Sequence, residues 1–280
     1  MATRREIFHQ LRSVAEELYG EAEGGQIAEM IVLSKGGITR NELLVEPNKE
    51  IVINDLDTVI EQLRSWRPVQ YIIGVASFDD MELEVGEGVL IPRPETEELV
   101  EWIASEAGRD AKIVDICTGS GCIALALRRR LAKSRVWGID ISAEALSIAR
   151  RNAEKYASDV ELKEGDALSD FDQLVDAEID VVVSNPPYIP MSDKKFMRRN
   201  VTDHEPQIAL FVEDDDPLLF YRSIARTAHR MLGDGGKLYF EIYENFARAM
   251  EDMLKTEGYD NIVVREDFRG KPRMICAEKR

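Results

Sequence analysis

The sequence predicts an α/β protein: a mostly parallel sheet with helices on both faces and one reversed strand, preceded by a small helical domain. Three observations support this. Strand-like and helix-like segments alternate from residue 110 onward, which is typical of a parallel sheet with crossover helices. The last two apolar strands are separated only by residues 267–273, too few for a crossover helix, so they should pair antiparallel. Apolar residues recur at helical spacing through residues 5–65.

The N-terminal part shows apolar helical stripes but no cluster of catalytic side-chain types, so we expect it to recognise a partner. We interpret Gly24-Gly25-Gln26 as a glycine break before a helix. Asp79-Asp80 is typical of the turn in a β-hairpin, with strand residues around it between positions 75 and 90. The predicted domains are a helical substrate-recognition domain (1–72), a β-hairpin linker (73–92) and an α/β domain (93–280).

Within the α/β domain, short apolar runs predict strands and longer periodic segments predict helices. The expected strands are 112–116, 135–139, 160–164, 179–184, 237–242, 262–266 and 274–277. The expected helices are 95–104, 122–131, 143–156, 217–232 and 246–257.

The composition restricts the function. The chain has 280 residues, 44% hydrophobic and 32% charged, which indicates an ordinary globular protein. Its formal net charge of −17 makes direct nucleic-acid binding unlikely to be its task. Cys117, Cys122 and Cys276 are too few for a disulfide framework, and no paired Cys/His set suggests a metal site. No apolar run is long enough to span a membrane, so we expect a cytoplasmic protein with no membrane association.

A glycine-containing loop between the first strand of the α/β domain and its helix predicts a nucleotide-type cofactor. Gly119 and Gly121 let the backbone approach a ligand closely, and Asp140, after the next strand, can accept hydrogen bonds from ribose hydroxyls. Residues 119–124 fit G-x-G-x-x-A, a pattern that also binds a nicotinamide dinucleotide.

Asp115 favours S-adenosylmethionine instead. Asp115 lies four residues before Gly119 and can receive the positively charged amino group of a methionine moiety, directly or through water. A pyrophosphate would gain nothing from the negative charge of Asp115. Asp166 follows the third strand and is placed to accept from an adenine amino group. These positions predict S-adenosylmethionine bound by the 115–121 loop and Asp140.

The tetrapeptide Asn185-Pro-Pro-Tyr188, directly after the strand 179–184, predicts the chemistry. A planar amide or aromatic –NH2 group is a poor nucleophile. The Asn185 side-chain oxygen and the Pro186 carbonyl can accept its two hydrogens, which favours charge developing on nitrogen and aims it for in-line displacement. The two prolines stiffen the turn, and Tyr188 offers an aromatic face to the planar group.

With these motifs, the chain resembles the HemK/PrmC protein-glutamine N5-methyltransferases. The resemblance spans nearly the whole chain and includes residues 67–74, 90–97, 115–121, 138–140, 184–189 and 201–206, and Asp267, Gly270 and Arg273. It implies a class I S-adenosylmethionine-dependent methyltransferase fold, and as substrate the Gly-Gly-Gln glutamine of peptide-chain release factors, its protein partners. The chain departs from the family pattern at His204, where an aromatic ring is usual, at Cys117, where Gly is frequent, and at Ala167, where some members carry a large aromatic residue.

The resemblance also implies roles for individual residues. Cofactor contacts are expected from Cys117, Thr118, Gly119, Ser120, Gly121, Asp140, Asp166, Ala167 and Asn185, with Arg93, Glu95 and Thr96 closing over the cofactor. Substrate binding is expected from Asn185, Pro186, Pro187 and Tyr188, with Asn185, Pro186 and Tyr188 catalytic.

Four alternatives remain open from the sequence. A glutamine of a ribosomal protein could be the methyl acceptor. A DNA adenine N6-methyltransferase would use the same Asn-Pro-Pro-Tyr motif, although the acidic composition and the lack of a target-recognition domain argue against it. A dinucleotide-dependent oxidoreductase would leave Asn185–Tyr188 without a role. A binding module that keeps the cofactor site without chemistry is the fourth.

Overall fold

A computed structural model describes residues 2–280, which form two compact units. One holds the chain up to Val75 together with Met197–His204; the other holds Ala76–Phe196 and Glu205–Arg280. The sequence analysis assigned all of 93–280 to the α/β domain. The segment Met197–His204 departs from that assignment, because its contacts are with the helical unit.

The helical unit is built on a pair of long helices that pack against each other. Its elements are β1 (Ala2–Thr3), α1 (Arg4–Tyr19), α2 (Glu21–Gly36), α3 (Arg40–Val45), β2 (Glu50–Ile51), α4 (Leu56–Arg64), α5 (Val69–Ile73) and α9 (Arg199–Thr202). Thr3 with Glu6 and Thr39 with Glu42 form capping boxes that fix the starts of α1 and α3. Buried aliphatic side chains such as Leu11, Ile31 and Leu63 form its core.

The glycine pair of this unit lies inside a helix, which corrects the expectation of a break at Gly24. The break is at Gly20, between α1 and α2, with φ +81°. Gly24 is buried, and a Cβ built on it would lie 2.5 Å from the backbone nitrogen of Glu16. The absence of a side chain therefore lets α2 cross α1 at backbone contact.

Met197–His204 is held in the helical unit by contacts from three side chains. A ring nitrogen of His204 lies 2.8 Å from the Ser65 carbonyl oxygen. Arg198 forms an ion pair with Glu23 at 2.7 Å, and the Arg199 guanidinium lies 5.8 Å from the centre of the Trp66 ring. His204, which stands where the family usually has an aromatic residue, therefore makes a polar contact with the end of α4.

The α/β unit contains a seven-stranded sheet of order β12-β13-β11-β8-β5-β6-β7. Its strands are β5 (Lys112–Ile116), β6 (Arg135–Asp140), β7 (Glu161–Glu164), β8 (Ile179–Ser184), β11 (Leu232–Glu241), β12 (Tyr259–Glu266) and β13 (Pro272–Lys279). Neighbouring strands from β11 to β7 pair in parallel, whereas β13 pairs antiparallel with both β11 and β12. The predicted α/β class and the reversed strand near the sheet edge are confirmed.

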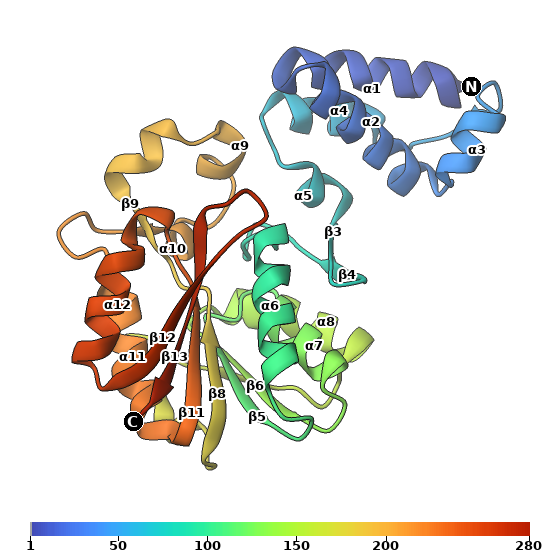
Figure 1. Ribbon diagram of the computed structural model, residues 1–280. Helices are drawn as coiled ribbons and strands as arrows, with labels where there is room; N and C mark the ends of the chain where they lie inside the picture. Colours follow the sequence, from blue (N-terminus) through green and yellow to red (C-terminus); the bar gives the residue numbers. More distant parts are fainter. Residues whose placement is uncertain (1) are drawn as a thin grey trace. The chain divides into compact units, whose positions relative to one another are not determined.

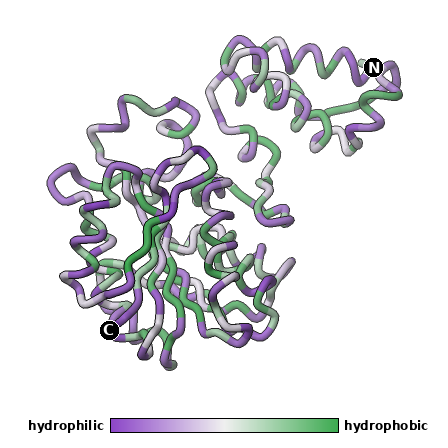
Figure 2. The backbone as a smooth tube through the Cα atoms, in the orientation of Figure 1, coloured by the Kyte–Doolittle hydropathy of each residue, from purple (hydrophilic) through white to green (hydrophobic). Residues whose placement is uncertain are grey.

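Helices cover both faces of this sheet (Figure 1). They are α6 (Pro94–Glu106), α7 (Cys122–Arg130), α8 (Ala143–Tyr156), α11 (Leu219–Met231) and α12 (Ala247–Thr256). One core, with Tyr221 and Met250, packs α11 and α12 on the sheet, and the other, with Leu99 and Leu125, packs α6 and α7. Figure 2 shows the hydrophobic colouring running along the central strands, as expected for strands buried on both faces.

The hairpin that precedes α6 is shorter than expected. It consists of β3 (Val75–Phe78) and β4 (Met81–Glu84), and the residues expected to extend its second strand, 85–90, form no strand. Asp79 and Asp80 both have positive φ, as the two central residues of a type I′ turn do. Glu84 donates its backbone N–H to the Asn152 side chain at 2.7 Å, which ties the hairpin to α8.

Between β8 and α11 the chain forms short elements that the sequence did not predict. They are β9 (Ile189–Pro190), α10 (Gln207–Leu210), β10 (Phe211–Val212), and a 3-10 helix over Met191–Phe196. The other 3-10 helices are Phe171–Leu174 and Glu244–Phe246. β10 pairs in parallel with β9, which follows β8 closely in the chain. After Met197–His204, the chain therefore comes back next to the end of β8.

Candidate active site

The loop after β5 has an unusual backbone. Cys117, Gly119 and Gly121 have φ of +61°, +56° and +83°. At Gly119 no atom lies within 4 Å of a built Cβ, so this position needs glycine for its backbone angle and leaves the backbone open to a ligand. Cys117 stands in the left-handed region that favours glycine, which accounts structurally for the Gly that is frequent there in the family it resembles.

Asp140, at the end of β6, organises the loop. Its two carboxylate oxygens accept the backbone N–H groups of Gly119 at 2.8 Å and Ser142 at 2.9 Å. Burial raises the pKa of Asp140. A carboxylate oxygen has more than one acceptor site, so Asp140 can hold the loop and still accept hydrogens from a ligand.

Asp115, at the β5 end of the loop, stabilises the loop from inside the protein. Its side chain is fully buried and accepts the Thr118 hydroxyl at 2.6 Å and the Ala124 N–H at 3.2 Å through one oxygen. Burial raises the pKa of Asp115 to about 7. The side chain is not among the residues that line the cavity, and its other oxygen has no hydrogen-bond partner within residues 2–280. The contact with a methionine amino group, directly or through water, stays a prediction. Through its hydrogen bonds to Thr118 and Ala124, Asp115 holds the loop between β5 and α7 in place.

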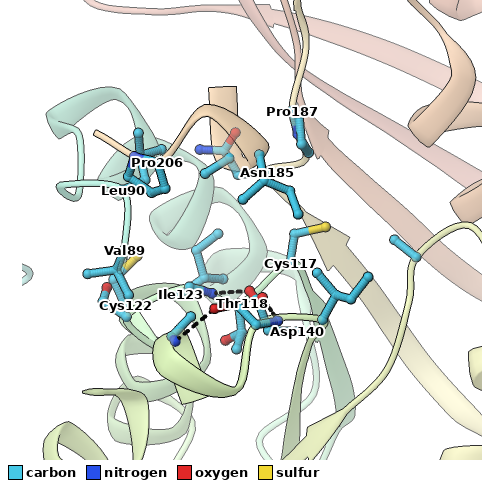
Figure 3. A pocket seen from close by; sticks show the side chains of 18 of the residues that line it. Val89, Leu90, Cys117, Thr118, Cys122, Ile123, Asp140, Asn185, Pro187 and Pro206 are labelled. Atoms are coloured by element: carbon cyan, nitrogen blue, oxygen red, sulfur yellow. Dashed lines mark hydrogen bonds between the residues drawn. The ribbon is translucent and has the colours of Figure 1, made fainter. Parts of the chain in front are cut away.

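A cavity of about 230 Å³ opens at the carboxyl ends of β5, β6, β7 and β8 (Figure 3). In such sheets ligands bind where the strand order reverses, and here the chain turns from one side of β5 to the other at β8. The predicted residues that line the cavity are Cys117, Thr118, Gly119, Ser120, Asp140, Asp166, Ala167, Asn185, Pro187, Arg93 and Thr96. Four others, Gly121, Glu95, Pro186 and Tyr188, do not line it.

The apolar part of the wall was missed by the sequence analysis. It includes Val89, Leu90, Ile141, Leu168, Pro206 and Phe220. Ile141 and Leu168 are 49% and 43% exposed, so large aliphatic surfaces face open space beside Asp140 and Asp166. The available signal was Ile141, directly after Asp140, and Leu168, two residues after Asp166.

Asp166 and Ala167 line the same end of the cavity. One Asp166 oxygen accepts the Leu168 N–H at 2.8 Å, and among residues 2–280 nothing donates to the other. Ala167 is buried and brings no aromatic ring to this end of the cavity. Phe220, from the residues of α11, supplies an aromatic ring to the wall from a different element.

Asn185 enters the site because β8 ends there. Ser184 closes the strand by donating its hydroxyl to the Ile116 carbonyl at 2.6 Å, which fixes the end of β8 against β5. Asn185 is half-buried on the cavity wall, and Figure 3 draws it on the other side of Cys117 from Asp140. Within the described residues the Pro186 carbonyl accepts no hydrogen bond, which leaves both proposed acceptors free.

Tyr188 is turned away from the cavity. Its hydroxyl donates to Glu241 at 3.0 Å, and its ring stacks on Tyr243 with centroids 6.1 Å apart. Burial raises the pKa of Tyr188 well above its usual value, so the phenol keeps its proton. The structure thus places Tyr188 behind the Asn-Pro-Pro turn, as a support for it.

The start of α6 and the residues just before it are held by contacts with distant parts of the α/β unit. The Arg93 guanidinium forms an ion pair with the buried carboxylate of Glu205 at 2.6 Å, and Glu205 also accepts the Ile91 N–H at 3.2 Å. Thr96 donates its hydroxyl to Glu241 at 2.6 Å. Glu95 lies 4.0 Å from the Arg269 guanidinium. Arg93 and Glu205 therefore join two walls of the cavity that are far apart in sequence.

These residues fit S-adenosylmethionine by their chemistry. Asp140 offers carboxylate acceptors for a ribose, Asp166 offers one for an adenine amino group, and the apolar wall beside them suits a planar base. The loop at Gly119 provides a cradle that a side chain would fill. Among residues 2–280, no group of three or more His, Cys, Asp or Glu side chains could hold a metal ion.

The sheet order, the reversed strand and a cavity at the ends of β5 to β8 define a class I methyltransferase fold. A methyltransferase of Pyrococcus furiosus shares it, with a TM-score of 0.53 and 17% identity over 80% of this chain and 97% of that one. The methyltransferase small domain family matches residues 94–203.

The particular family follows from full-length relatives. The release factor glutamine methyltransferase of Flavobacterium psychrophilum is 41% identical over 246 residues, covering 85% of this chain and 86% of the relative. That of Bacteroides thetaiotaomicron is 38% identical over 274 residues, covering 96% and 98%. The chain belongs to the family of release factor glutamine methyltransferases, and the predicted family is confirmed. In the described part of the chain, no helix combines the length and the apolar character needed to cross a membrane.

Proposed function

We propose that this protein transfers a methyl group from S-adenosylmethionine to the side-chain amide nitrogen of the Gly-Gly-Gln glutamine in peptide-chain release factors, in the cytoplasm. The observation that carries the proposal is the position of Asn185, half-buried at the end of a buried strand on the wall of the cavity that suits the cofactor. Names of the relatives supply the substrate class. The structure supplies the groups that would hold its amide.

The proposed chemistry depends on two acceptors. Asn185 accepts one hydrogen of the glutamine –NH2 through its side-chain oxygen, and the Pro186 carbonyl accepts the other. Both stabilise positive charge as it develops on nitrogen and hold the nitrogen in one orientation. When bound, S-adenosylmethionine would supply the electrophilic methyl group, whose bond to sulfur breaks as the bond to nitrogen forms, with S-adenosylhomocysteine as the leaving group. The methylated nitrogen is acidic enough to lose its proton to water, so no strong general base is needed.

For the cofactor we propose contacts with Asp140 and with the loop from Cys117 to Ser120. Asp140 would accept from the ribose hydroxyls, and the free oxygen of Asp166 would accept from the adenine amino group. Ile141 and Leu168 would lose their exposure against the base. Phe220 would supply the aromatic packing that Ala167 does not.

We assign recognition of the release factor to the helical unit and the hairpin. Leu44, Val45 and Val52 of that unit are 71%, 70% and 58% exposed and offer apolar surface for a partner to cover. Leu44→Ser should raise the KM for the release factor and leave cofactor affinity unchanged. Phe268→Ser is a matched control, because Phe268 is also apolar and 63% exposed but lies in the α/β unit. An unchanged KM in Leu44→Ser would contradict this assignment.

The proposed reaction is tested by single-turnover transfer of labelled methyl to a purified release factor. Asn185→Ala should lower the transfer rate by about 10²–10³, the usual loss when one preorganised electrostatic contact is removed, with cofactor affinity nearly intact. A release factor whose Gly-Gly-Gln glutamine is replaced should accept no label. Wild-type rates in Asn185→Ala would overturn the mechanism.

The alternative acceptors are outcomes of the same assay. Label on a ribosomal protein in place of the release factor would keep the reaction and change the partner. Label on DNA, together with salt-sensitive DNA binding, would replace the proposed function with adenine methylation.

A further inference from the structure

A buried chain of polar side chains lies behind Asn185 and ends at a carboxylate on β11. Glu241 is 1% exposed and Thr96 is 2% exposed. The Thr96 hydroxyl lies 2.6 Å from one Glu241 oxygen, and the Tyr188 hydroxyl lies 3.0 Å from the other. The Asn185 amide nitrogen lies 3.5 Å from the Thr96 hydroxyl oxygen. The family resemblance implies a cofactor contact for Thr96 and no role for Glu241.

The direction of each hydrogen bond follows from the number of hydrogens. A carboxylate accepts and does not donate, so both hydroxyls donate to Glu241. The Thr96 hydroxyl then has no hydrogen left and offers only lone pairs toward Asn185. The –NH2 end of the Asn185 amide must therefore face Thr96, because its oxygen would be repelled there.

From this polarity we infer that Thr96, held by Glu241, is a positioning residue that sets the orientation of the Asn185 amide and leaves its oxygen to accept the substrate hydrogen. This inference rests on the proposed function of Asn185 as an acceptor. An amide turned by 180° would present –NH2 to the substrate –NH2, and two donors cannot pair. The orientation of the Asn185 amide therefore decides whether the site can accept the substrate –NH2 group.

Neighbouring groups stabilise the negative charge that Glu241 needs to accept both hydrogen bonds in a buried position. Burial raises the pKa of Glu241, while the two hydroxyls and the positive charge of Arg273 oppose that effect. Arg273 is itself held by Asp267 at 3.3 Å and Glu244 at 3.5 Å. Asp267, Gly270 and Arg273 are the closing motif of the family pattern, and they support the carboxylate from the β12–β13 side.

The test compares hydroxyl-free and hydroxyl-bearing variants at one position. Thr96→Val has nearly the same shape as threonine and removes the hydroxyl, whereas Thr96→Ser keeps it. We expect Thr96→Val to slow single-turnover methyl transfer by about three- to tenfold, the equivalent of one ordinary hydrogen bond, at saturating cofactor and release factor. Thr96→Ser should recover most of the rate. Cofactor affinity, measured by calorimetry, should stay at the wild-type value in both.

A matched control is Thr227→Val, which removes a hydroxyl that is 4% exposed, on α11 and outside the cavity wall. It should transfer methyl at the wild-type rate. If Thr96→Val does not fold, as judged by thermal unfolding, Thr96→Ala removes the same hydroxyl without adding a methyl group and carries the same expectation.

A second readout does not depend on activity. The side-chain amide signal of Asn185 in a ¹⁵N-edited NMR spectrum, assigned by its loss in Asn185→Ala, should show faster hydrogen exchange with water in Thr96→Val than in Thr96→Ser. If the wild-type protein methylates no release factor, the proposed function fails while this readout still tests the orientation. The inference is overturned if Thr96→Val keeps the wild-type rate and exchange, if Thr96→Ser is as slow as Thr96→Val, or if the whole loss lies in cofactor affinity.

Discussion

Two neighbouring glycines of α2 should respond in opposite directions to the same substitution. A Cβ on Gly24 would lie 2.5, 2.7 and 2.8 Å from backbone atoms of Glu16 and Ala15, whereas the nearest atom to a Cβ on Gly25 is the Arg12 Nε at 4.0 Å. Carbon contacts are favourable at about 3.5–4.0 Å, so Gly24→Ala requires α1 and α2 to separate by roughly 1 Å.

Two opposing contributions to the free energy of unfolding decide whether each substitution stabilises the unit. Overpacking a tight contact costs about 1–3 kcal/mol, and replacing glycine by alanine within a helix returns about 0.5–1 kcal/mol. The net effect of Gly24→Ala should be a loss of up to about 2.5 kcal/mol, at the upper end of the overpacking range, because backbone atoms cannot move aside as a side chain can. Gly25→Ala has only the favourable contribution and should stabilise the unit by about 0.5–1 kcal/mol.

The assay must isolate the helical unit, because a chain with two units need not unfold in one step. Hydrogen exchange of the α1 and α2 amides, followed by mass spectrometry on the intact protein, reports local opening. Protection should fall in Gly24→Ala and rise in Gly25→Ala. Equal or greater protection in Gly24→Ala would refute the interpretation of Gly24 as the point of backbone contact.

Three further predictions concern the site. Asp140→Ala should weaken S-adenosylmethionine binding by about 30- to 150-fold, since two ribose hydrogen bonds of about 1–1.5 kcal/mol each are lost; unchanged affinity by calorimetry would contradict the assignment. Burial raises the pKa of Asp115 to about 7, above its unfolded value, so the folded state favours the protonated form and loses stability as pH rises from about 4 to 7. Asp115→Asn should flatten that slope in denaturant titrations at several pH values, and an identical slope would show the reasoning wrong. Glu205→Ala leaves the Arg93 guanidinium and a backbone N–H without their acceptor, and should cost about 1–3 kcal/mol in denaturant unfolding; a neutral effect would mean that water replaces the carboxylate.

Local patterns in the sequence predicted much of the fold. Strand β8 was predicted to the residue, because a run of Ile and Val bounded by a turn is a strong signal for a buried strand. The polar wall of the cavity was also predicted, because Asp140 and Asn185 directly follow strands whose ends share one edge of the sheet.

What the sequence could not reveal depends on contacts between distant residues. The Glu205–Arg93 ion pair joins positions 112 residues apart, and no local spacing indicates it. The burial of Asp115 is set by α7 and the loop together, which its spacing to Gly119 does not indicate. The position of Met197–His204 depends on surfaces of α2 and α4 that the segment itself does not encode.

That segment has a practical consequence for anyone dissecting the molecule. The chain passes from one unit to the other at Val75–Ala76, again at Phe196–Met197, and a third time at His204–Glu205. A single cut after Val75 would therefore leave Met197–His204 behind on the α/β fragment, stripped of Glu23, Ser65 and Trp66. The helical unit is not a module that can be removed or exchanged at one junction. A faithful truncation or chimaera must also replace the loop between β9 and α10, a few residues after the Asn-Pro-Pro-Tyr turn.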